Sequence, residues 1–192
     1  MKPMDMMMKL KVGLVMVALV FSAGVATAKE PELTVVDSVE LDRYLGVWYE
    51  ISSYPAWFQR NCTAVSANYS LRDDGLIKVV NSCRKGSLDG KLKQANGRAK
   101  VVDTETNAKL KVSFFGPFWG NYWIIDLDPD YQWVVVGEPQ RKYLWILSRT
   151  RSMDDEIYGQ IVARLPDKGY DPSGLQQTVQ PDPQAESKGV SE

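Results

Sequence analysis

Short segments of alternating apolar and polar residues make up most of the chain after residue 46. They are rich in Val, Ile, Tyr, Trp and Phe, and Gly, Pro, Asn and Asp separate them, which is typical of an antiparallel barrel or sandwich. Eight segments are predicted as strands, at about 47–54, 63–71, 76–83, 92–102, 108–115, 121–127, 132–137 and 143–149. We therefore expect an all-β fold, an eight-stranded antiparallel up-and-down β-barrel, which can close around its own side chains or around one small ligand.

One later segment has helical spacing instead. Its apolar residues are Ile157, Ile161, Val162 and Leu165. Ser152 as N-cap, three acidic residues after it and Pro166 at the end predict one amphipathic helix of about 13 residues. Segments 132–137 and 143–149 are apolar on both faces, so we expect this C-terminal α-helix to pack there on the outside of the barrel.

Alternation within the strands also predicts which side chains face the barrel interior. In 92–102, long polar residues alternate with small ones, and small inward residues would leave space for a ligand. The residues predicted to line a ligand cavity are Val65, Ala67, Tyr69, Ile77, Val79, Ala95, Gly97, Ala99, Leu110, Val112, Phe114, Tyr122 and Ile124.

The stretch FFGPFWGNYW, from Phe114 to Trp123, places aromatic residues in a turn, where polar residues are usual. In an up-and-down barrel this turn shares a rim with the connection between the first two strands. We therefore predict Phe118 and Trp119 at the cavity entrance, opposite Trp57 and Phe58. Residues predicted to meet a polar headgroup are Tyr54, Arg60 and Asn81, with solvated loop positions as the equal alternative.

The first 28 residues have the features of a secretory signal peptide. Lys2, Lys9 and Lys11 precede an apolar run at 12–25, and Ala26-Thr27-Ala28 suits cleavage after Ala28. The alternative, a membrane anchor, is disfavoured because the run is shorter than the roughly 20 residues of a span. The run contains no cysteine, so we expect an exported protein that is periplasmic, or associated with the outer membrane, without a lipid anchor.

The predicted divisions are a signal peptide at 1–28, an N-terminal extension at 29–37, the barrel domain at 38–178 and a disordered tail at 179–192. The tail is predicted to be disordered because it is Pro-rich and polar.

Composition restricts the chemistry. The chain has no histidine, which excludes Ser-His and Cys-His nucleophile pairs and His-ligated metal sites. Its net charge of −1 and lack of a basic run give no indication of nucleic-acid binding. Cys62 and Cys83 are an even pair in an exported chain, so we predict a disulfide, with two free thiols as the alternative. We expect no catalytic residue, no metal and no cofactor.

Three separated motifs carry a family resemblance. They are Gly46-Val47-Trp48-Tyr49-Glu50, Asp128-Pro129-Asp130-Tyr131 and Leu147-Ser148-Arg149-Thr150. With them, residues 38–178 resemble the lipocalin family, specifically the bacterial outer-membrane lipocalin type related to apolipoprotein D, although Leu127 replaces the threonine that precedes the second motif. The resemblance implies that Gly46, Trp48 and Arg149 close one end of the barrel, with Arg149 over the Trp48 ring.

The resemblance also implies a function. It is non-catalytic binding, storage or transport of a hydrophobic ligand, a fatty acid or lysophospholipid, in the cell envelope, in membrane maintenance or stress. One alternative is a lipocalin-fold enzyme that acts on a lipid or carotenoid through a free cysteine. Another is an interaction protein that uses the aromatic rim. Membrane association, and whether the chain is a monomer or a homodimer, are left open.

Overall fold

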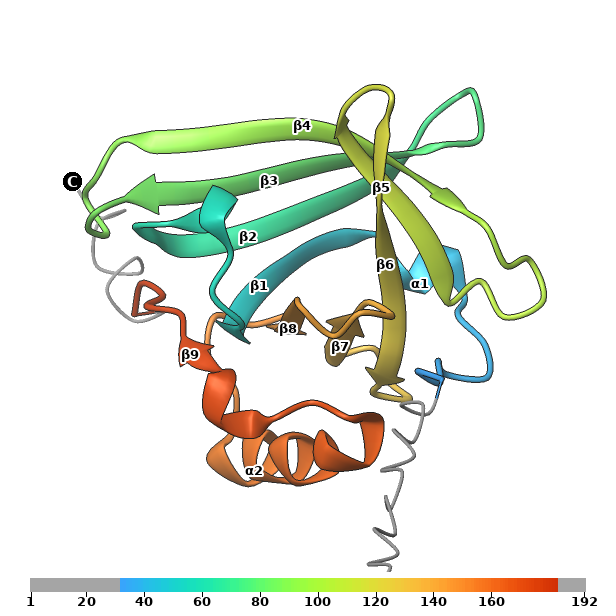
Figure 1. Ribbon diagram of the computed structural model, residues 1–192. Helices are drawn as coiled ribbons and strands as arrows, with labels where there is room; N and C mark the ends of the chain where they lie inside the picture. Colours follow the sequence, from blue (N-terminus) through green and yellow to red (C-terminus); the bar gives the residue numbers. More distant parts are fainter. Residues whose placement is uncertain (1–31, 183–192) are drawn as a thin grey trace, which may run out of the picture.

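One antiparallel sheet closes on itself to form the barrel in the computed structural model, which describes residues 32–182 (Figure 1). Its strands are β1 (Gly46–Ser53), β2 (Cys62–Leu71), β3 (Ile77–Lys85), β4 (Leu92–Val101), β5 (Lys109–Phe115), β6 (Phe118–Leu127), β7 (Trp133–Gly137), β8 (Leu144–Ser148) and β9 (Gln176–Gln177). Strands β2 to β8 pair in sequence order, and β1 pairs with both β8 and β2. The closed eight-stranded barrel confirms the predicted fold.

The strand that departs most from its predicted start is β6. It begins at Phe118 instead of about residue 121, and Phe118 pairs with Phe115 across a turn made by Gly116 and Pro117. The aromatic stretch is therefore the tip of a β-hairpin and not a longer loop. A register shift between Val112 and Phe115 lies just below the tip.

The predicted helix is present as α2 (Asp155–Arg164). The predicted N-cap Ser152 was wrong, because the Asp154 carboxylate Oδ1 accepts the backbone N–H groups of Glu156 at 2.9 Å and Ile157 at 3.2 Å. A carboxylate at this position also complements the positive end of the helix dipole. The helix is shorter than predicted, because the chain continues as a 3-10 turn, η2 (Pro166–Lys168).

Two apolar clusters lie on the two sides of the sheet. The outer cluster joins Ile161 of α2 and Leu165, the C-cap of that helix, to Val135 on β7 and to Leu144 and Ile146 on β8. As predicted, the helix covers the strands that are apolar on both faces (Figure 1). The inner cluster lies inside the barrel and includes Trp48, Tyr69, Ile77, Val79, Ala99, Leu110, Ile124, Val134, Val136 and Leu147.

Several short elements complete the barrel. They are α1 (Leu41–Tyr44), η1 (Trp57–Gln59) and η3 (Pro172–Gly174). Residues of the predicted N-terminal extension also pack on the barrel, since Leu33 belongs to the outer cluster and the Val36 N–H donates to the Ile124 carbonyl. The predicted signal peptide lies outside the described residues. Within residues 32–182, no helix is long and apolar enough to cross a membrane.

The C-terminal segment occupies the seam where β1 and β2 separate. These strands pair only from Gly46↔Tyr69 to Tyr49↔Ser66. Farther along, β9 pairs with Ser52 and Ser53 of β1, and the Ala64 N–H of β2 donates to the Val179 carbonyl at 2.8 Å. Gln180 Nε2 donates to the carbonyls of Glu50 and Val65, so the chain stays bound to the barrel two residues into the predicted tail. Residues 183–192 lie outside the described part.

The two cysteines form the predicted disulfide. It joins Cys62 on β2 to Cys83 on β3, with 5.5 Å between their Cα atoms. Within the described residues there is no free cysteine. The bond therefore fixes these neighbouring strands at the end where β1 and β2 are apart.

The N-cap gives a direct stability test. We expect Asp154→Ala to lower the free energy of unfolding by about 1 kcal/mol, because two helix N–H groups lose their acceptor. Ser152→Ala is the matched control and should change it by less than about 0.5 kcal/mol. Urea unfolding monitored by circular dichroism gives both values; equal losses from the two variants would contradict the assignment of Asp154 as the cap.

Candidate ligand-binding barrel

Trp48 and Arg149 close one end of the barrel. Trp48 is fully buried, and its indole Nε1 donates to the Tyr44 carbonyl at 2.8 Å. The Arg149 guanidinium carbon lies 3.7 Å from the centroid of the Trp48 ring, which is a cation–π contact. The guanidinium also donates to the Val47 carbonyl at 2.9 Å and to the Tyr131 carbonyl at 3.2 Å. These contacts join β8, β1 and the turn before β7 into one plug.

Gly46 is favoured by its backbone conformation. Its φ of 93° is in the left-handed region that favours glycine. A Cβ atom at this position would lie 3.5 Å from Arg149 Nη1, which is an ordinary van der Waals contact. The glycine of the motif therefore serves the backbone turn into β1 and not the packing of the arginine.

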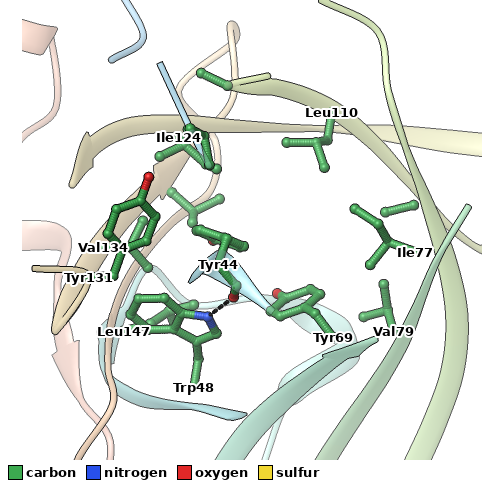
Figure 2. Packing of buried hydrophobic residues seen from close by; sticks show 14 residues of the cluster. Tyr44, Trp48, Tyr69, Ile77, Val79, Leu110, Ile124, Tyr131, Val134 and Leu147 are labelled. Atoms are coloured by element: carbon green, nitrogen blue, oxygen red, sulfur yellow. Dashed lines mark hydrogen bonds between the residues drawn. The ribbon is translucent and has the colours of Figure 1, made fainter. Parts of the chain in front are cut away.

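Apolar and tyrosine side chains fill the half of the barrel next to the plug. Figure 2 shows Tyr44 between Trp48 and Tyr69, with Ile77 and Val79 along the neighbouring wall. The remaining cavity is about 10 Å³ and is lined by Tyr44, Tyr69, Ile77, Ala99, Leu110, Val112 and Tyr122. This volume suits about one water molecule and no acyl chain. The predicted cavity residues in the half next to the plug therefore pack against one another and form the floor of the barrel.

Three tyrosine hydroxyls form a chain within the floor. The Tyr44 and Tyr122 oxygens are 2.6 Å apart, and those of Tyr122 and Tyr69 are 3.0 Å apart. Burial raises the pKa of all three phenols well above the usual value. They therefore stay protonated and satisfy one another's hydrogen bonds inside the barrel.

The opposite half of the barrel is open. Asn81 on β3 pairs with Ala67 on β2 and with Ala95 on β4, so the three residues share the inward face. Ala95 is nevertheless exposed. Asn81 Oδ1 is buried without a hydrogen-bond partner. Small side chains and one hydrogen-bond acceptor without a partner thus line this half.

Phe114 limits the depth of the open half. A Cβ atom added to Gly97 would lie 2.8 Å from the Phe114 ring, so the ring packs directly over the glycine. The space that the small residues of β4 were predicted to leave is partly filled here. Ala95, one inward position nearer the rim, stays uncovered.

Aromatic rings form a continuous row at the rim. Trp57 contacts Phe58 with ring centroids 5.6 Å apart, Phe58 contacts Tyr143 at 5.7 Å, and Tyr143 stacks on Trp145 at 5.7 Å. Trp57 is 71% and Phe58 44% exposed, whereas Trp145 packs against the inner cluster. The row therefore leads from solvent into the barrel.

Other predicted site residues lie elsewhere. Trp119 lies on the outer face of the sheet, between Arg98 (5.3 Å from guanidinium carbon to ring centroid) and Lys100 (4.7 Å from Nζ). Phe118 is 75% exposed at the hairpin tip. The Tyr54 hydroxyl donates to the Asp171 carbonyl outside the barrel, at 2.6 Å. Trp119 does not join the cavity residues, and Val65 is half-buried beside the bulge of β2. Tyr54 lines the polar pocket beside the rim, together with Arg60.

A polar pocket of about 340 Å³ lies beside the rim, under the connection from β1 to β2. Glu50, Ser53, Gln59, Arg60 and Thr178 contribute to its wall. Glu50 is only 3% exposed, and burial raises the pKa of its carboxyl group, an effect that three hydrogen bonds oppose. The pocket combines this buried carboxyl group with an exposed arginine.

Sequence reasoning missed Tyr44, Glu50, Tyr143 and Trp145 as site residues. A charge within the apolar strand GVWYEISS was the available signal for Glu50, because ionised side chains are rarely buried. For Tyr143 and Trp145, the available signal was topological. The connection from β7 to β8 shares a rim with the connection from β1 to β2 in an up-and-down barrel. Tyr44 belongs to a four-residue helix that no periodicity indicates.

Comparison with known proteins agrees with this architecture. The family described as "Lipocalin-like domain" matches residues 39–180. The chain is a lipocalin. It is 40% identical to temperature-induced lipocalin-1 from Arabidopsis thaliana, over 85% of this chain and 91% of that protein. It is 43% identical to outer membrane lipoprotein Blc from Escherichia coli K12, over 78% of this lipocalin and 84% of that protein.

More distant relatives share the fold. Mouse apolipoprotein D is 32% identical, over 74% of this lipocalin and 78% of that protein. Insecticyanin from the tobacco hornworm superposes with a TM-score of 0.63 at 20% identity, over 79% of this lipocalin and 86% of that chain. The predicted membership of a family that includes bacterial proteins and apolipoprotein D is confirmed.

Two tryptophans with different surroundings test this description of the lipocalin barrel. We expect Trp48→Ala to lower the free energy of unfolding by about 3 to 5 kcal/mol, because it empties the plug beneath Arg149. Trp119→Ala, on the outer face, should lower it by less than about 1 kcal/mol. Denaturant unfolding measures both; similar losses would contradict the central role of the plug.

Proposed function

We propose that this lipocalin binds a long-chain amphiphile, a fatty acid or lysophospholipid, in the open half of its barrel, and stores or carries it without catalysis. The observation that carries the proposal is the pair of small inward positions, Ala67 and Ala95, above a packed apolar floor that ends at Phe114. An acyl chain fits such a surface because it can replace water against apolar walls without displacing the floor.

Apolar burial supplies the affinity. An acyl chain that loses about 300 Å² of apolar surface gains roughly 7 kcal/mol at about 25 cal/mol per Å². Association costs several kcal/mol of this, which leaves an affinity of about millimolar or weaker before polar contacts are added. Phe114 and Trp145 provide the largest rings next to the open half, and the rim row from Trp57 to Tyr143 extends this surface toward solvent.

The proposed place of action is the cell envelope, after export to the periplasm. Two observations support it: the first 28 residues have the pattern of a signal peptide, and the similar Escherichia coli protein is called an outer membrane lipoprotein. A disulfide between Cys62 and Cys83 is also consistent with an oxidising compartment. Each barrel would hold its own ligand, in a monomer or a homodimer.

The disulfide bears on the alternative of a thiol-dependent enzyme. That mechanism requires a thiolate on Cys62 or Cys83, and the two sulfur atoms are joined. We expect a count of zero free thiols when the unreduced, denatured protein is titrated with a thiol reagent. Two thiols per chain would revive the enzymatic alternative.

Adjacent positions on β4 test where the ligand lies. We expect Ala95→Trp to weaken binding of a fluorescent fatty acid roughly tenfold or more, because the ring occupies the open half. Asn96→Trp adds the same ring on the outer face of the same strand and should leave the affinity within about twofold. Unfolding curves for both variants verify the fold; equal affinities for the two would contradict binding inside the barrel.

A further inference from the structure

Strands β3, β4 and β5 carry only positive charges. They contain eight lysine and arginine residues and no aspartate or glutamate, although the whole chain has 23 basic and 24 acidic residues. The inward positions of these strands belong to the inner cluster, so the alternate positions project outward from the barrel. Four exposed residues there form what we call the basic face: Lys78, Arg98, Lys100 and Lys111. A single sign of charge on one side of a nearly neutral protein indicates a partner of the opposite charge.

The members of the basic face lie opposite one another across the sheet. Lys78 on β3 pairs with Arg98 on β4, and Lys100 on β4 pairs with Lys111 on β5. Like charges at directly paired positions destabilise a sheet. Within residues 32–182, none of the ion pairs includes any of these four side chains. The fold therefore contains a repulsion that its own acidic residues do not relieve.

Trp119 relieves only part of this repulsion. The centroid of its ring lies 5.3 Å from the Arg98 guanidinium carbon and 4.7 Å from Lys100 Nζ. An aromatic ring attracts a cation but does not neutralise it. Lys109 on β5 differs, because Glu32 is an acidic partner at 4.0 Å. The positive charge that remains is therefore concentrated on the basic face.

Two exposed phenylalanines adjoin the basic face at the tip of the β5–β6 hairpin. Phe115 is 76% and Phe118 75% exposed, and the two residues pair across the turn. Arg98 reaches this turn, because its Nη2 lies 3.6 Å from the place that a Cβ atom on Gly116 would take (Figure 1). Large apolar rings next to basic side chains are typical of surfaces that dock on membranes, where the rings enter the acyl boundary and the cations meet anionic headgroups.

We propose that the basic face docks on the surface of an anionic lipid bilayer, with Phe115 and Phe118 in its interfacial region. A bilayer complements both parts of this surface, because its phosphate groups attract the cations and its acyl boundary accepts the rings. A soluble polyanion complements the cations alone. The inference goes beyond the proposed function, since docking needs no ligand inside the barrel.

The hairpin tip also determines how the barrel meets the bilayer. The β5–β6 and β1–β2 connections share one rim of an up-and-down barrel, which is the rim that carries the aromatic row. Docking through the tip therefore brings the open half of the barrel close to the bilayer. An amphiphile that moves between the two then has a shorter path through water, the unfavourable environment for an acyl chain.

Vesicle sedimentation tests the docking surface. Delipidated protein is mixed with vesicles of phosphatidylcholine alone, or of equal parts phosphatidylcholine and phosphatidylglycerol. We expect at least about tenfold stronger binding to the mixed vesicles, and loss of that difference at high salt, which screens exposed charges. Equal binding to both vesicles, or binding to neither, would overturn the proposal. No acyl ligand is added, so this failure is distinct from a failure of the proposed lipid-binding function.

The double variant Lys100→Gln, Lys111→Gln removes one of the two repulsive pairs. We expect it to bind the mixed vesicles roughly tenfold or more weakly, because each cation close to an anionic surface adds to the attraction. It should nevertheless unfold at the same or a higher urea concentration than the wild type, because a repulsion is lost. Wild-type affinity, or weaker binding together with a lower unfolding midpoint, would overturn the proposal, since the lower midpoint indicates a structural role.

The double variant Lys142→Gln, Lys168→Gln is the matched control. It removes the same total charge from the β7–β8 connection and from η2, away from the basic face. Its binding to the mixed vesicles should stay within about twofold of the wild type, because charges far from the contact are screened. Equal weakening by the two lysine variants would show that net charge alone acts, and would overturn the assignment of the surface.

The hairpin tip separates a bilayer from a soluble polyanion. We expect Phe115→Ser with Phe118→Ser to weaken binding to the mixed vesicles roughly tenfold, because two apolar rings lose their place in the acyl boundary. Heparin, a soluble anionic polysaccharide, serves as the comparison. Vesicle binding that this variant leaves unchanged, or heparin binding tighter than vesicle binding in the wild type, would assign the basic face to a polyanion and overturn the bilayer.

Discussion

The two-sided pairing of β1 is the constraint on which the rest of the structure depends. β1 pairs with β8 along one edge and with β2 along the other, and this closes the barrel. At the end where both pairings meet, Trp48 fills the interior and Arg149 covers its ring while donating to the Val47 carbonyl. A closed barrel has no exposed sheet edge. Closure at this end lets the inner cluster pack without a cavity large enough for a ligand.

The same strand creates the opening at the other end. β1 and β2 diverge after Tyr49↔Ser66, and their free backbone groups need partners. The C-terminal segment supplies them: β9 pairs with β1, and Gln180 donates to carbonyls on both sides of the seam. Thr178 brings a hydroxyl to Glu50 in the process. The polar pocket is therefore a consequence of how the C-terminal segment pairs with the free backbone groups of β1 and β2.

Alternation was sufficient to predict the barrel and the inward faces of β3 to β5, because a buried face repeats every second residue. It failed at positions set by non-periodic geometry. Trp119 was predicted at the entrance because the predicted start of β6, about residue 121, was too late. Tyr122 faces inward, and because side chains alternate along a strand, residue 119 lies on the outer face. Two of the partners of Glu50 are distant in sequence: Gln59 belongs to the connection between β1 and β2, and Thr178 lies 128 residues away, which no local pattern could indicate.

The unequal ends of the barrel determine how an amphiphile can lie in it. Near the plug, the Tyr44, Tyr69 and Tyr122 hydroxyls already bond to one another, so an ionised headgroup there would lose its water without gaining a cation. At the seam, the polar pocket is lined by the exposed Arg60 as well as by Glu50, so charged groups can be matched there. A bound amphiphile would therefore place its acyl end toward the floor and its polar end at the seam. This orientation follows from the desolvation of charge, before any particular ligand is considered.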